Sequence, residues 1–348
     1  MPNERGPHHP ILGGDVVGEG KVIGFAQARS GHPDATTDRL LLVGDELLDE
    51  PPARSVPGDA AGVVMFALSP DERLSDTRRK PAAEVDAGLA DAVADELTRP
   101  GAPWVPVAND LIEALRDDRH FVWLTGGMTR AVISRQETAN DLDLAGTAPP
   151  GRFLDIARAL MVRHGQEHRV QFSPDTLLCY AKSDETRLYE YRTLNLPGSR
   201  YPAGGSDLAA DAEFRDLTIN SLFYDPVRKV VLDPSGQGLE HLGSTPRVLA
   251  SVNTSVDPAV RGRVIIRAVK FVVRWRDSIE CDISELARHL RDYPEDLVER
   301  LSIEELRELG GAHRYELGEV PADRQRVAAA ELAPVAVRLI DVLLEGGA

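Results

Sequence analysis

The sequence predicts an α+β protein, in which a mixed sheet with its helices is followed by a helical C-terminal region. Three observations lead to this fold class. From Val107 onward, helical and strand patterns alternate; a hairpin pattern at 176–196 adds an antiparallel pair; beyond Pro258 only helical patterns occur. Alternating units build a sheet covered by helices, and a separate run of helices after them favours the α+β class.

The first hundred residues differ in character and predict an additional β-rich region. Apolar runs separated by Gly, Pro and Asp are the expected strands: residues 21–28, 38–47 and 61–69. A helix is expected over 84–98, and the Pro- and Gly-rich residues 99–103 are typical of a linker.

Chain length bounds the number of domains. With 348 residues, the chain has room for two domains or three smaller ones. We expect a β-rich N-terminal region of unknown role at 1–103, a head at 104–250 and a helical neck and body at 251–348.

Composition favours a water-soluble, cytoplasmic protein. No apolar run approaches the 18 residues of a membrane span, and the N-terminus lacks the pattern of a signal peptide. Cys179 and Cys281 are too few for a disulfide framework or a cysteine zinc site. The net charge of −16 works against a broad phosphate-binding face, although a local basic groove remains compatible with it.

In the head, each expected element follows from its local pattern. Amphipathic stretches predict helices, and short apolar or alternating runs predict strands. The expected elements are a helix at 107–118, a strand at 121–125, a short helix after Gly127, a strand through 141–143, a helix at 150–165, a hairpin of 176–183 with 186–196, a helix at 214–223 and a strand at 229–233.

The C-terminal region is expected to be helical throughout. In the helix at 263–275, four cations fall on one narrow stripe, because they are spaced i, i+4, i+7 and i+11: Arg263, Arg267, Lys270 and Arg274. Ser302 with Glu305 forms a capping box, and residues 327–344 predict one long helix with an apolar face.

Residues 121–145 carry the strongest chemical signal. A Thr125-Gly126-Gly127 turn opens a short helix that carries Arg130, and glycines at a helix start let backbone N–H groups approach an anion. Asp141 and Asp143, two apart on a strand, point the same way. The stretch therefore predicts a site for phosphate and a divalent metal.

Three further segments follow in order. In FRDLTINSL (214–222), the polar residues Arg215, Asp216 and Asn220 recur at near-helical spacing. DPSGQGLE (233–240) comes next, with Arg247 downstream, and the basic stripe of 263–275 is the third segment.

In this order and spacing, residues 107–276 resemble the class II CCA-adding enzymes and bacterial poly(A) polymerases of the DNA polymerase beta nucleotidyltransferase superfamily. That family carries GG-x-x-R, D-x-D, R-R-D-F-T-I-N-A, D-P-x-G and E-D-x-x-R motifs. The resemblance implies a polymerase-beta-like head that uses a nucleoside triphosphate such as ATP or CTP and two magnesium or manganese ions.

The resemblance also implies roles for individual residues. Asp141 and Asp143 would hold the metal ions, and Glu190 is the candidate third catalytic carboxylate. The implied nucleotide-binding residues are Gly126, Gly127 and Arg130 around the triphosphate; Arg215 with Asp216 at the ribose, and Asn220 in the same segment; Arg267 and Lys270 on the basic helix, which also faces phosphate; and Asp257 with Arg261 as the base-reading pair. A solvated charged face is the alternative reading of that helix.

Several positions depart from the family pattern. Ala131 and Phe214 replace an Asp and an Arg, and His241 stands where the D-P-x-G motif has Asp. Asp257 and Arg261 match the base-reading pair only if three residues are inserted, which is about 4.5 Å of helix. Base preference therefore cannot be inherited from the family.

The tail leaves the acceptor open. From Arg276 to Ala348 there are nine Lys and Arg against seventeen Asp and Glu, so this segment offers no counter-surface for a polyanion. The sequence favours nucleotidyl transfer to a hydroxyl acceptor other than intact tRNA, either a small molecule or an RNA 3′ end. Two alternatives remain: CCA or poly(A) addition to an RNA 3′ end, and a regulatory module that binds nucleotide with little catalysis.

Overall fold

The computed structural model describes most of the chain from residue 70 onward, and the expected strands at 21–69 lie outside it. The described residues are 70–165, 169–173, 178–183, 186–195, 202–205 and 207–346.

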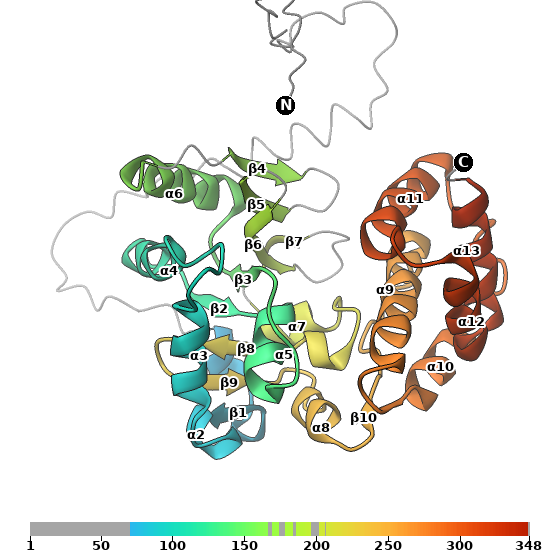
Figure 1. The fold of residues 1–348 in the computed structure, drawn as a ribbon, viewed down its shortest axis with the longest axis horizontal. Coiled ribbons are helices and arrows are strands. Elements are labelled where there is room, and N and C mark those ends of the chain that lie inside the picture. The colour runs from blue at the N-terminus through green and yellow to red at the C-terminus, as the bar shows by residue number, and fades with distance from the viewer. Residues whose placement is uncertain are drawn as a thin grey trace, which may run out of the picture. The chain divides into compact units, whose positions relative to one another are not determined.

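A nine-stranded mixed sheet forms the centre of the head (Figure 1), as the sequence predicts. Its order is β1-β9-β8-β2-β3-β6-β5-β4, with β7 also paired to β6. Only β3 and β6 run parallel; the other pairs of this sheet are antiparallel. The strands are β1 (Arg79–Pro81), β2 (Val122–Leu124), β3 (Leu142–Gly146), β4 (Arg169–Ser173), β5 (Leu178–Ser183), β6 (Thr186–Asn195), β7 (Pro202–Gly205), β8 (Phe223–Asp225) and β9 (Val230–Leu232).

Helices cover this sheet and share the head's apolar core with its strands. The helices α4 and α6 lie side by side against the strands (Figure 1), and their Leu111, Leu115 and Phe153 are fully buried. The head helices are α2 (Ala82–Val85), α3 (Leu89–Leu97), α4 (Ala108–Asp117), α5 (Gly126–Ser134), α6 (Pro150–Arg163), α7 (Leu208–Ala212) and α8 (Gly238–Gly243).

Residues just before the expected start of the head also pack into it. β1 pairs with β9, and Leu89, Val93 and Trp104 join the head's buried core. The structure therefore places residues 79–104 with the head's sheet and core, although the sequence pattern groups 79–103 with the N-terminal region.

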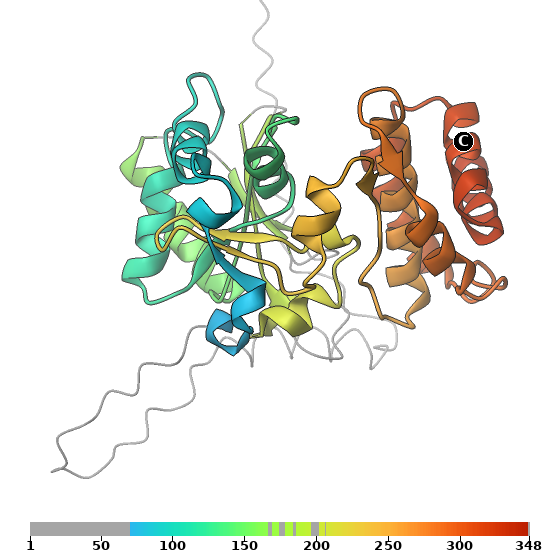
Figure 2. The ribbon, with the colours of Figure 1, turned by 90° about the horizontal axis from the view of Figure 1, so that it is seen from below.

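A second apolar core joins the C-terminal helices (Figure 2). These are α9 (Pro258–Arg276), α10 (Ser284–Arg291), α11 (Ile303–Leu317), α12 (Ala322–Leu332) and α13 (Pro334–Glu345), beside the short parallel pair β10 (Arg247–Val248) and β11 (Cys281–Asp282). The α9 face opposite the basic stripe is buried through Val264, Ile265 and Ala268. The capping box of Ser302 and Glu305 is present at α11. Among the described residues, no helix is long and apolar enough to cross a membrane.

Three helix predictions need correction. Residues 214–223 form only a 3₁₀ turn at Thr218–Asn220 that leads into β8, because their polar side chains bond within the site. The helix expected at 327–344 is two helices, because Pro334 lacks an amide hydrogen and begins α13. The helix expected at 84–98 is divided into α2 and α3 at 86–88.

Candidate functional site

Three carboxylates meet where β3 and β6 run parallel. Asp143 and Glu190 are register partners on these strands, and Asp141 comes immediately before β3. One carboxylate oxygen from each of Asp141, Asp143 and Glu190 lies within 4.8 Å of the others. Carboxylate oxygens are the ligands that Mg²⁺ and Mn²⁺ prefer, so this half-buried carboxylate triad fits a divalent cation.

The Gly126-Gly127 loop packs directly against Asp143. Gly126 has φ of +56°, and a Cβ there would lie 2.6 Å from Asp143 Oδ2, so both conformation and space require glycine. The Gly127 N–H donates to the same oxygen at 2.6 Å, and the Thr125 N–H donates to the Asp143 carbonyl at 3.0 Å. The loop thus fixes one member of the triad. Binding of a triphosphate by the same loop stays a prediction.

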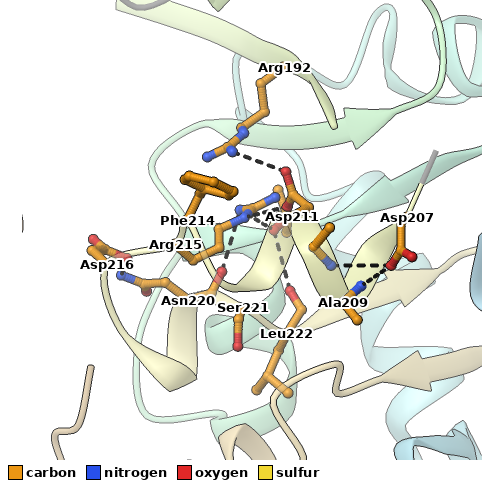
Figure 3. Close-up of polar contacts among 12 residues, drawn as sticks. Arg192, Asp207, Ala209, Asp211, Phe214, Arg215, Asp216, Asn220, Ser221 and Leu222 are labelled. Carbon is orange, nitrogen blue, oxygen red and sulfur yellow. Dashed lines mark hydrogen bonds and ion pairs between the residues drawn. The ribbon is translucent and has the colours of Figure 1, made fainter. Parts of the chain in front are cut away.

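A buried ionic network joins Asp211 to Arg192 and Arg215 (Figure 3). Asp211 is fully buried on α7. Its carboxylate accepts hydrogen bonds from Arg192 Nη2 at 3.2 Å and from Arg215 Nε at 2.9 Å. Arg215 Nη1 in turn donates to Thr125 Oγ1 at 2.9 Å. Asp211 therefore connects β6, the loop and the Arg215 segment. Sequence reasoning missed it, although its i, i+4 spacing to Arg215 was visible.

Arg130 reaches the 214–222 segment from α5. It is 4% exposed, donates to Asn220 Oδ1 and stacks over Phe271 with 4.9 Å between the guanidinium carbon and the ring centroid. Burial lowers the Arg130 pKa to about 10. The structure therefore brings together Arg130 and Asn220, which the sequence singled out separately.

Asp216 links the head to α9. It accepts from Asn220 Nδ2 at 2.9 Å and from Arg267 Nε at 2.8 Å. Burial by itself would raise the Asp216 pKa, but the Arg267 charge and the hydrogen bonds from Arg267, Asn220 and the Leu217 N–H outweigh it and hold that pKa at about 2.

Every cation of the α9 stripe has an acidic partner. Arg267 and Lys270 both pair with Glu316 of α11, Arg267 at 2.6 Å. Burial lowers the Lys270 pKa, and the nearby Arg267 charge adds to this. The other two pairs are Arg263 with Glu308 at 3.2 Å and Arg274 with Glu137 at 3.2 Å.

These acidic partners were not found from the sequence. Glu308 and Glu316 lie on a helix more than forty positions away from their partners, so only the packing of α11 on α9 reveals them. Each cation of the stripe is therefore paired with a carboxylate. The stripe is neither an unpaired phosphate-binding surface nor a face that contacts only solvent.

Asp257 and Arg261 do not line the central cavity. Asp257 caps α9 by accepting the Ala259 N–H at 2.9 Å, and Arg261 Nε donates to the Ser255 carbonyl at 2.8 Å. Arg261 also stacks over Tyr293, with 4.8 Å to the ring centroid. Both side chains make their hydrogen bonds at the start of α9, and neither lines the cavity that holds the carboxylate triad.

A cavity of about 900 Å³ joins the remaining predicted residues. Its walls include the triad, the Gly126-Gly127 loop and parts of α9 and α11. Nine basic and seven acidic side chains line it, a net charge of +2 in a chain of net charge −16. Among the described residues, buried N–H groups of three lining arginines have no hydrogen-bond partner: Arg130 Nε, Arg192 Nε and Arg215 Nη2. The cavity suits an anion beside a metal.

Comparison with protein families gives a match at the head. Residues 122–246 match the family described as the poly A polymerase head domain. The match begins at β2 and ends just before β10. A comparison with curated proteins gives no match.

Solved structures of CCA-adding enzymes are similar in fold to this chain. The complex of a CCA-adding enzyme with ATP is 17% identical, covers 74% of this chain and 55% of its own, and has a TM-score of 0.50. The complex with CTP is 16% identical, covers 73% and 55%, and has a TM-score of 0.50. The Thermotoga maritima CCA-adding enzyme complexed with tRNA-CCA is 16% identical, covers 73% and 54%, and scores 0.49. This chain spans about half the length of these enzymes.

Proposed function

We propose that the protein is a metal-dependent nucleotidyltransferase. It transfers a nucleoside monophosphate from a nucleoside triphosphate to a hydroxyl acceptor and releases pyrophosphate. The observation that carries this proposal is the carboxylate triad, whose oxygens lie within 4.8 Å of one another at the wall of a cationic cavity. The match of residues 122–246 to the poly A polymerase head domain supports the same reaction.

The triad is the proposed metal site, with Mg²⁺ as the expected ion and Mn²⁺ as its substitute. Two divalent ions held by shared carboxylates make an acceptor hydroxyl more nucleophilic and neutralise a departing pyrophosphate. Asp143 is held in place by the Gly127 N–H, and Glu190 is aligned with it by strand register.

The proposed triphosphate site is the arginine cluster of the head. Arg130 and Arg215 are buried, and each retains an N–H without a hydrogen-bond partner in the described part of the chain. Guanidinium groups suit phosphate because they present several donors in one plane. Asp211 and Asn220 position these arginines, so their free donors are fixed before the ligand arrives.

Two acceptor classes fit this site. The first is a hydroxyl compound other than intact tRNA, since residues 276–348 carry nine Lys and Arg against seventeen Asp and Glu and so offer no counter-surface for a polyanion. The second is an RNA 3′ end, in keeping with the CCA-adding enzymes of similar fold in complex with ATP and with CTP. Either acceptor would receive the nucleoside monophosphate in the same metal-dependent reaction at the carboxylate triad.

The proposal is tested with the full chain, Mg²⁺ and each α-labelled nucleoside triphosphate, over a panel of RNA ends and small hydroxyl compounds. We expect labelled product and equimolar pyrophosphate with at least one acceptor. Asp143→Asn should abolish both, whereas Arg288→Ala, an exposed change on α10 away from the cavity, should not. Nucleotide binding that persists in both variants without turnover on any acceptor would instead indicate a regulatory module.

A further inference from the structure

One face of α11 looks into the cavity and is not used by the head chemistry. Its members are Arg307, Gly311, Arg314 and Tyr315, here called the α11 face, and all four line the cavity. Arg307, Gly311 and Arg314 are spaced i, i+4 and i+7, so they share one side of the helix, and Tyr315 lies next to Gly311 one turn on.

The α11 face combines open space with an aromatic ring. Tyr315 is 65% exposed, and it is one of the few large apolar side chains in the described part that is this exposed. A Cβ built on Gly311 would meet no atom within 4 Å, so the helix surface beside the ring is vacant. A flat group can therefore lie along Gly311 and against Tyr315.

The charges of the α11 face differ from those of the α9 stripe. Each α9 cation is paired with a carboxylate, whereas no carboxylate in the described ranges pairs with Arg307 or Arg314. Both guanidinium groups are exposed in a C-terminal region that is otherwise acidic. Two unneutralised arginines beside an aromatic ring match a ligand with phosphate and a planar base, since single-stranded nucleic acids are bound in this way.

The α11 face is also held in a fixed place. Leu309 packs so closely on α9 that a Cβ at Gly262 would lie 2.6 Å from its Cδ1. The pairs of Glu308 with Arg263 and Glu316 with Arg267 lie on the neighbouring side of α11. Its cavity-facing groups are therefore preorganised, which lowers the ordering cost of binding.

We propose that the α11 face binds a phosphorylated nucleoside unit of the acceptor, with Tyr315 stacked on its base and Arg307 and Arg314 on its phosphates. This inference rests on the proposed function and deepens it, because it restricts the acceptor to a nucleotide chemistry. The unit can be a free mononucleotide or the last unit of an RNA chain.

The test measures binding to the full chain without divalent metal or triphosphate, so that it is independent of catalysis. The probes are AMP and CMP, and fluorescently labelled tetraribonucleotides ending in C or A. We expect at least one probe to bind, and Tyr315→Ala to weaken that binding about tenfold while Tyr315→Phe retains it. Arg307→Ala should lower the salt dependence of oligonucleotide binding by about one unit of slope.

Controls separate this site from the head. Arg288→Ala, exposed on α10, should leave probe binding unchanged, and Tyr315→Ala should leave Mg²⁺-dependent triphosphate binding unchanged. Preference for the oligonucleotide identifies an RNA end, and equal affinity for mononucleotide identifies a small acceptor. Failure of every probe to bind wild type, or unchanged binding to Tyr315→Ala, overturns the inference. Loss of binding in Tyr315→Ala supports it even if no nucleotidyl transfer is found.

Discussion

The two sides of the cavity hold their cations in different ways. On the head side, Arg130 and Arg215 are buried and keep free N–H donors. On the helical side, Arg267 and Lys270 share Glu316, and their charges are largely neutralised. The comparison shows that a row of cations in the sequence does not by itself predict an anion-binding site, because carboxylates from another helix can pair with them. The head arginines also have carboxylate partners, Asp211 for Arg215 and Glu137 for Arg130, but each keeps an N–H without a hydrogen bond, whereas the α9 stripe binds phosphate only in competition with its own carboxylates.

The largest difference in transfer rate is expected between substitutions at Glu190, on the head side of the cavity, and at Glu316, on the helical side. Glu190→Gln removes a member of the triad and should lower the single-turnover transfer rate by about 10³-fold, since a metal contributes several kcal/mol to such a transition state. The rate is measured with labelled triphosphate at saturating Mg²⁺.

Glu316→Gln is the matched control for this measurement. It removes the partner of Lys270 and should preserve the rate within about tenfold, with triphosphate binding a few-fold tighter because one opposing charge is lost. Equal rate losses in the two variants would mean that the helical side is as much part of the chemistry as the head.

The second contrast concerns Asp211. Asp211→Ala leaves Arg192 and Arg215 without their buried partner, and we expect the free energy of unfolding to fall by about 3–5 kcal/mol. Asp207→Ala, at the N-cap of the same helix, removes the cap that accepts the Ala209 N–H at 2.8 Å and the Ala210 N–H at 3.1 Å, together with an exposed ion pair to Arg73, at a cost of about 1 kcal/mol. Urea unfolding of both variants measures the difference. Similar losses would show that the network does not stabilise the head.

The third contrast tests the α9–α11 contact. Gly262→Ala places a Cβ against Leu309, and we expect a loss of about 1–3 kcal/mol from overpacking. Gly310→Ala, on α11, meets only Arg314 Nη1 at 3.7 Å and should be neutral or stabilising by up to about 1 kcal/mol. Thermal unfolding distinguishes them. A stable Gly262→Ala protein would show that α11 can move away from α9.

The smallest effect is expected from acid. The pKa of Asp216 is lowered to about 2 in the folded protein, while unfolded Asp titrates near 4. Its stabilising contribution is therefore complete above about pH 4 and is lost as the pH falls toward 2. Asp216→Asn should reduce the pH dependence of Tm between pH 5 and 2.5. An unchanged profile would mean that Arg267 and Asp216 are not paired in solution.

The sequence alone predicts the mixed sheet and the chemistry of the head. Asp141, Asp143 and the glycine loop are close in sequence, and their meaning follows from strand alternation and helix starts. Glu190 could be proposed because it lies on the same face of its strand as Arg192, but its place beside Asp143 follows only from the parallel register of β3 with β6.

What the sequence does not predict depends on long-range packing. Glu316 neutralises Lys270 from a different helix, and no local pattern shows that. Asp257 looks like a base-reading residue in the chain but caps α9 in the fold, because a helix start needs an acceptor for its free N–H groups. Pro334, by contrast, was a visible signal that divides the last helix in two.

The central claim is that Asp141, Asp143 and Glu190 together hold divalent ions for nucleotidyl transfer. Its most direct test counts Mn²⁺ ions bound per chain by electron paramagnetic resonance, with a non-hydrolysable triphosphate present, in wild type and in Asp141→Asn/Asp143→Asn. We predict two bound ions in wild type and loss of that binding in the variant, at unchanged Tm. Equal binding in both proteins would contradict the account.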